Sequence, residues 1–164
     1  MIKFFGLNII TMCGIGYSKY IPGTMASFIT CLIYIFFFTL KLNLYLLISF
    51  LFLTTIISIV LIDKLSRHFK EKDAKEIVID EFIGQSIPIL IFYSFVSFSD
   101  SGNFFILTFI SFLFFRFFDI LKPYPINLID KKIKNGFGVV FDDIIAGIYS
   151  SISILIIFVI ILYA

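Results

Sequence analysis

Long apolar segments alternate with short polar segments along nearly the whole chain. Five such segments can be distinguished, at residues 26–40, 44–62, 82–98, 104–118 and 144–163. A helix that crosses a bilayer needs about 20 mostly apolar residues, so the third and fourth segments are shorter than a standard span. None shows the alternation of polar and apolar residues that a membrane β-barrel requires. Backbone exposed to lipid must satisfy its own hydrogen bonds, and the pattern therefore predicts an all-α fold.

The composition supports a membrane location. The 164 residues are 60% hydrophobic and 15% charged, whereas about a quarter of a typical soluble domain is charged. No linker or repeat divides the chain, so we expect a single domain over 1–164, and we expect the N-terminal segment to be retained in the mature protein. The predicted fold is a compact helical membrane protein with about four to five membrane-embedded helices.

The remaining composition excludes several other classes. A net charge of +2 gives no support for a nucleic-acid partner. Cys13 and Cys31 are isolated, without the spacing of a disulfide framework or a zinc site. The single histidine, His68, lies in a polar segment without a motif, and we expect it in solvent.

Basic residues are concentrated in the segments that connect alternate apolar runs, where the positive-inside rule applies. The rule places the N-terminus and both large loops in the cytoplasm and the C-terminus outside. The loops assigned to the cytoplasm contain Lys64, Arg67, Lys70, Lys72, Lys75, Lys122, Lys131, Lys132 and Lys134. The opposite loops hold only Lys41 and Asp100. Most acidic residues fall on the cytoplasmic side too, so the polar motifs are predicted to cluster there.

Two pairs of acids, Asp80-Glu81 and Asp142-Asp143, precede apolar segments. One explanation is structural, because the dipole of a helix favours carboxylates at its N-terminal end. The other is a magnesium site, since Mg²⁺ prefers oxygen ligands and Asp119 would add a further carboxylate. Acids this close repel one another unless a cation lies between them. The spacing leaves both explanations open.

Arg116, Asp119 and Lys122 share a helix face by their spacing. They form either an intrahelical Arg116–Asp119 ion pair, or a site where Asp119 binds metal and the two cations bind phosphate. The segments 22–24 (PGT) and 136–138 (GFG) are expected to form turns whose N–H groups could face an anion. Lys131, Lys132 and Lys134 are expected to attract anionic lipid from a solvated face.

Three segments resemble those of the phosphatidylglycerophosphatase A family of bacterial membrane lipid phosphatases. They read PGTMAS at 22–27, KEIVIDEFIGQ at 75–85, and FRFFDILKPYPI followed by NGFGVVFDDIIAGI within 115–148. The motifs occur in the order of the family, and the resemblance runs from about 14 to 148. Two departures, Ala26 and Asn135, stand where the family often has glycine, and neither touches a carboxylate.

The resemblance implies a compact helical enzyme that removes the terminal phosphate of phosphatidylglycerophosphate with the help of Mg²⁺ and gives phosphatidylglycerol. It also implies an active site at the cytoplasmic face of the bacterial inner membrane. From the residues we assign metal binding and catalysis to five acids, and phosphate binding to three further residues. The acids are Asp80, Glu81, Asp119, Asp142 and Asp143, and the phosphate-binding residues are Thr24, Arg116 and Lys122.

Several alternatives remain open at the level of sequence. The motifs of phosphatases with cysteine, aspartate or histidine nucleophiles are missing, which favours direct attack by water but leaves a covalent aspartyl route possible. The substrate could be another lipid phosphate. A non-enzymatic membrane protein such as a transporter is disfavoured, because the apolar runs contain almost no charge near their centres.

Overall fold

The computed structural model describes residues 2–65, 74–98 and 100–163, and over these residues the secondary structure consists of helices without strands. This confirms the predicted fold class. Of the residues discussed above, Arg67, His68, Lys70 and Lys72 lie outside the described part. The described helices are α1 (Ile2–Ile10), the short 3₁₀ helix η1 (Ile15–Tyr17), α2 (Pro22–Thr39), α3 (Leu44–Leu65), α4 (Ile79–Phe95), α5 (Ser101–Leu121), α6 (Ile126–Lys132) and α7 (Gly136–Tyr163).

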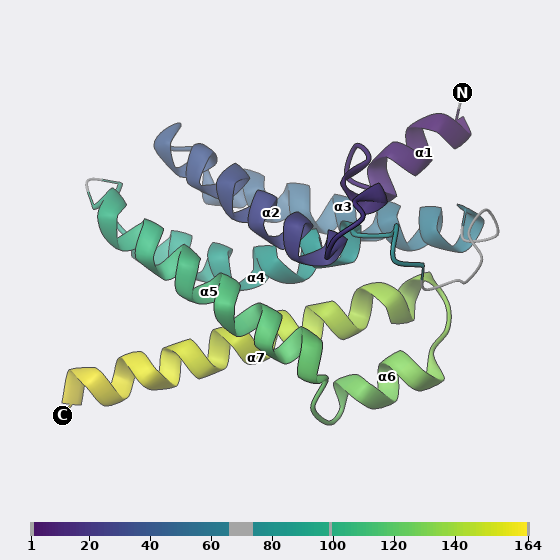
Figure 1. Ribbon diagram of the computed structural model, residues 1–164. Helices are drawn as coiled ribbons and strands as arrows, with labels where there is room; N and C mark the ends of the chain where they lie inside the picture. The colour runs from purple at the N-terminus through teal and green to yellow at the C-terminus, as the bar shows by residue number, and fades with distance from the viewer. Residues whose placement is uncertain (1, 66–73, 99, 164) are drawn as a thin grey trace.

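Within the described part of the chain, four helices are long and apolar enough to cross a membrane by length and composition: α2, α3, α5 and α7. They indicate a multi-pass membrane protein. The segment predicted at 82–98 behaves differently, because α4 has 17 residues and most of them are buried. Helix α4 lies in the middle of the molecule and packs against α2, α3, α5 and α7 (Figure 1). Its apolar side chains therefore contact protein, and its small and polar residues, including Gln85 and Pro88, are enclosed by the other helices.

Aromatic side chains fill the bundle where α2, α4 and α5 meet at the ends away from the paired acids. The rings of Phe38 and Phe104 stack with their centroids 3.9 Å apart, and Tyr93 meets both edge-on. The Tyr93 hydroxyl donates a hydrogen bond to the Leu42 carbonyl at 2.7 Å. Such aromatic pairs contribute about 0.5–1.5 kcal/mol each beyond the area they bury, so this cluster anchors the bundle at a distance from the polar end.

Helices α4 and α7 approach closely because each carries a glycine at their contact. A Cβ atom added to Gly147 would lie 2.3 Å from the carbonyl oxygen of Gly84, and one added to Gly84 would lie 2.6 Å from the carbonyl oxygen of Asp143. Pro88 has no N–H, so it cannot bond the Gly84 carbonyl four residues earlier, and that carbonyl faces Gly147 instead. Asp80 and Asp143 each precede one of these glycines by one helical turn.

Candidate active site

The polar ends of four helices enclose a pocket of about 370 Å³, a size in the usual range for small-molecule sites. Its walls come from the first turns of α2 and α4, the last turns of α5 and the second turn of α7. All eight residues that the sequence assigned to the site line this pocket: Thr24, Asp80, Glu81, Arg116, Asp119, Lys122, Asp142 and Asp143. Segments separated by more than a hundred residues in the sequence thus meet at one place.

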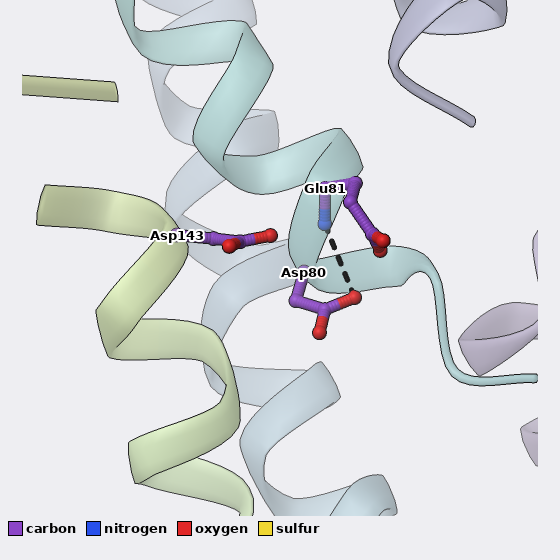
Figure 2. A group of neighbouring side chains, drawn as sticks. All are labelled: Asp80, Glu81 and Asp143. Carbon is purple, nitrogen blue, oxygen red and sulfur yellow. Dashed lines mark hydrogen bonds between the residues drawn. The ribbon is translucent and has the colours of Figure 1, made fainter. Parts of the chain in front are cut away.

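Three of the acids form a compact cluster at the base of the pocket. Asp143 projects from α7 towards the first turn of α4, which carries Asp80 and Glu81 (Figure 2). Each of the three offers one carboxylate oxygen, and these oxygens all lie within 4.8 Å of one another. Asp80 is 8% exposed and Asp143 is 4% exposed. Within the described part of the chain, Glu81 Oε2 is buried without a hydrogen-bond partner. An unsatisfied carboxylate oxygen beside two buried acids could hold a metal ion, which would supply the missing partner.

Burial raises the pKa of Asp80 well above its usual range, and the charge of the adjacent Glu81 raises it further. Burial also raises the pKa of Glu81, although a hydrogen bond with Asp80 and the charge of Arg116 oppose the shift. The Glu81 N–H donates to Asp80 Oδ1 at 3.1 Å. This hydrogen bond from the first turn of α4 offsets only part of the negative charge of the two carboxylates. A cation bound between these acids would favour their ionised forms, and metal binding would therefore release protons.

Arg116 lies beside Asp119, with Nη1 2.6 Å from Asp119 Oδ2. The ion pair proposed from the sequence is therefore present. The Asp119 carboxylate thus faces Nη1, whereas among the described residues Arg116 Nε is buried without an acceptor. Arg116 also lines the pocket, so its pairing with Asp119 does not exclude a contact with an anion there.

Lys122 follows α5 directly in a left-handed conformation, with φ 43°. Its Nζ donates to Asp142 Oδ2 at 2.7 Å and lies 3.4 Å from Asp130 Oδ1. Burial would lower the pKa of Lys122, but the hydrogen bond and charge of Asp142 and the charge of Asp130 outweigh it and raise the pKa. Lys122 therefore stays charged, and it joins the end of α5 to α7. Asp130 contacts this lysine without lining the pocket.

The sequence predicted a separate turn at the PGT segment. In the structure this segment is instead the first turn of α2. Pro22 occupies the first helical position, where its missing N–H costs nothing. The next N–H groups have no carbonyl partner within the helix, because the first intrahelical bond runs from Met25 to Ile21. A Cβ atom on Gly23 would lie 2.0 Å from Glu81 Oε1, so the absence of a side chain lets this helix start close to the acidic cluster.

The expectation for 136–138 is wrong. Gly136 and Gly138 form the first turn of α7, and their N–H groups donate to Asp63 Oδ1 at 2.6 Å and Asn135 Oδ1 at 2.9 Å. Both donors are occupied by side-chain oxygens of the protein, one of them in the Asp63 carboxylate, so neither is free for a substrate anion. Because α7 begins at Gly136, Asp142 and Asp143 lie in its second turn. The helix dipole therefore does not explain this acidic pair, whereas Asp80 and Glu81 do lie in the first turn of α4.

One cation in the pocket was missed as a site residue. Lys75 lines the open side of the pocket and is exposed, just before α4. From the sequence alone, Lys75 was counted only among the basic residues of its loop. Its position five residues before Asp80, inside the second motif, is the sequence feature that could have identified it as a site residue.

Comparison with known proteins shows which family the chain belongs to. The family model described as phosphatidylglycerophosphatase A matches residues 8–158. The chain belongs to the phosphatidylglycerophosphatase A family. This confirms the resemblance drawn from the motifs, and it makes the chain a member of a family of phosphatases.

Individual relatives of this chain differ in how much of their length aligns with it. A phosphatidylglycerophosphatase A of Escherichia coli is 30% identical over 84% of this chain and 74% of its own. One of Haemophilus influenzae is 57% identical over 42 residues, only 26% of either chain. A protein of Bacteroides thetaiotaomicron named putative phosphatidylinositol-3-phosphatase is 32% identical over 93% of this chain and 92% of its own. No solved structure matches.

Proposed function

We propose that this chain hydrolyses the terminal phosphate of phosphatidylglycerophosphate in a Mg²⁺-dependent reaction and gives phosphatidylglycerol. The observation that carries the proposal is the meeting of Asp80, Glu81 and Asp143 within 4.8 Å at the base of a pocket lined by Arg116 and Lys122. Family membership supports the reaction class. The pocket lies at one end of helices that could cross a membrane, which suits a phosphate at the headgroup level of a lipid.

The donor set fits Mg²⁺, because it consists of carboxylate oxygens, one of them buried and unsatisfied. We assign Asp80, Glu81 and Asp143 as the residues that hold the ion, with Asp119 and Asp142 completing the acidic lining. A bound Mg²⁺ would polarise the phosphoryl group and offset the charge of the acids. The site is proposed to face the cytoplasm of a bacterial inner membrane, in line with the basic residues around it.

The protein's own groups would position the phosphate. The guanidinium of Arg116, which lines the pocket, would donate to phosphoryl oxygens, and the first turn of α2 with Thr24 would contact the same anion. Lys122 fixes Asp142 and adds positive charge at the rim. Water attacks phosphorus in line with the leaving glycerol oxygen, and a carboxylate of the pocket accepts the water proton. As the bond between phosphorus and the glycerol oxygen breaks, that oxygen takes a proton from solvent water, and the carboxyl group then returns its proton to solvent.

A second substrate is favoured by one specific observation. The Bacteroides relative, which aligns over 92% of its length, carries a name that refers to phosphatidylinositol 3-phosphate. Both lipids present a phosphomonoester on a polyol headgroup, so the same acidic pocket would suit either.

The test is phosphate release by the purified chain from three lipids at one Mg²⁺ concentration: phosphatidylglycerophosphate, phosphatidylinositol 3-phosphate and phosphatidic acid. The proposal expects the highest kcat/KM for phosphatidylglycerophosphate. A clear preference for phosphatidylinositol 3-phosphate would transfer the assignment to that lipid. Release from none of the three would refute the enzymatic assignment.

A further inference from the structure

An apolar groove adjoins the acidic pocket on the outer side of α2 and α5. Its volume is about 270 Å³, and it is lined by Thr24, Met25, Phe28, Ile29 and Phe112. Thr24 lines the acidic pocket as well, so the two hollows share a wall. The acidic pocket and the apolar groove therefore meet at the first turn of α2.

The direction of the groove follows from the packing of the two helices. Phe28 meets Phe112 with ring centroids 6.2 Å apart, and Cys31 Sγ lies 4.0 Å from the Thr108 carbonyl oxygen. Residue numbers thus rise along α2 while they fall along α5, and the helices are antiparallel. On α5, Phe112 lies one turn before Arg116, and on α2, Phe28 lies one turn after Thr24. The groove leads from the phosphate-binding donors along the helices, away from the polar end.

The groove opens onto surfaces suited to lipid. Both helices are long and apolar enough to cross a membrane. Met25 is 41% exposed and Phe28 is 51% exposed. Further along, exposed apolar side chains continue the same two helices at Leu32, Phe36, Phe105 and Phe109. An acyl chain could therefore enter the groove from the bilayer without passing a charged side chain.

We propose that this groove binds the first part of an acyl chain of the lipid phosphate whose headgroup lies in the acidic pocket. The inference rests on the proposed phosphatase function. It assigns the recognition of lipid, as distinct from phosphate, to Met25, Phe28, Ile29 and Phe112. Thr24 then lies at the junction, where the glycerol ester would pass from the polar to the apolar hollow.

The first test fills the groove. Ile29 is half-buried in its wall, and Ile29→Trp would place a larger ring there. Leu113→Trp is the matched control, because Leu113 adjoins Phe112 on α5 and is 51% exposed without lining the groove. One methylene group in an apolar pocket changes kcat/KM by about 10–200-fold, so we expect a loss of at least about tenfold for Ile29→Trp with phosphatidylglycerophosphate. Hydrolysis of glycerol 3-phosphate, which has no acyl chain, should be unchanged.

The outcomes separate the two proposals. If wild type releases no phosphate from any lipid, the proposed function fails. If wild type acts on the lipid but Ile29→Trp matches Leu113→Trp, the function stands and the groove assignment is wrong. An equal loss on both substrates would also overturn the groove assignment, because it would show damage to the acidic pocket.

A second measurement does not depend on a substitution that fills space. Photoreactive benzoylphenylalanine replaces Phe28, or Leu113 as control, in nanodiscs of phosphatidylcholine with a minor fraction of a non-hydrolysable phosphonate analogue of the lipid phosphate. At position 28, we expect the share of lipid adducts that contain the analogue to exceed the mole fraction of the analogue in the nanodisc by at least about tenfold. This is the factor expected above for selectivity in an apolar pocket. At position 113 that share should match the mole fraction. Equal enrichment at both positions, or an adduct between two copies of the chain at position 28, would overturn the proposal.

Discussion

The contact between Gly84 and Gly147 sets the distance between the acids on α4 and α7, so Gly147→Ala should impair catalysis. The new Cβ would lie 2.3 Å from the Gly84 carbonyl oxygen, whereas ordinary contacts begin at 3.4 Å. The obstacle is backbone and cannot rotate away, so the helices would separate by about 1 Å in a closely packed core. Asp143, one turn earlier on α7, would move away from Asp80 and Glu81. A misplacement of about 1 Å can lower a rate about 10²-fold, and we expect a loss of this size in kcat.

The assay is phosphate release from phosphatidylglycerophosphate over a range of Mg²⁺ concentrations, with the free energy of unfolding measured in parallel. Overpacking should cost about 1–3 kcal/mol of stability. Gly102→Ala is the matched control, because it also lies in a helix and its added Cβ would meet nothing within 4 Å. If Gly147→Ala retained kcat and Mg²⁺ affinity within threefold of this control, the close contact would not determine the geometry of the site.

Three further predictions follow from the pocket. Asp80→Asn and Asp143→Asn should each reduce phosphate release to background while the protein still inserts into membranes; full activity in either variant would remove that residue from the proposed metal site. Lys122→Met should lower kcat about 10–100-fold, because Lys122 orients Asp142 at 2.7 Å, with the exposed Lys131→Met as control; equal rates in the two variants would refute that role. The raised pKa of Asp80 means that the folded chain binds more protons than the unfolded chain above the usual carboxyl range. Metal-free protein should therefore lose stability as pH rises towards the raised pKa, and Mg²⁺ should increase Tm more at pH 8 than at pH 5; circular dichroism melts that show no such trend would contradict this.

The sequence was sufficient to predict which charged groups line the pocket, because their charge depends on residue type alone. Carboxylates beside apolar segments are costly to bury, which singled out Asp80, Glu81 and Asp143 together with Asp119 and Asp142. The apolar runs also predicted helices that could cross a membrane. All eight assigned residues line one pocket.

What the sequence could not supply depended on contacts between distant segments. The apolar content of 82–98 does not reveal whether the surrounding medium is lipid or protein, and only packing shows that α4 is enclosed. The start of α7 was misplaced because Gly136 and Gly138 suggest a turn, whereas Asp63 and Asn135 satisfy their N–H groups and let the helix begin early. Lys75 was overlooked because its charge matched that of the loop around it.

The most direct test of the central claim is the Mg²⁺ dependence of phosphate release from phosphatidylglycerophosphate by chelator-treated wild-type protein. The account predicts release at background level without the cation, a saturable rise as Mg²⁺ is added, and loss of that rise in Asp143→Asn. Equal rates with chelator and with Mg²⁺ would contradict the assignment of the three buried acids to a catalytic metal site.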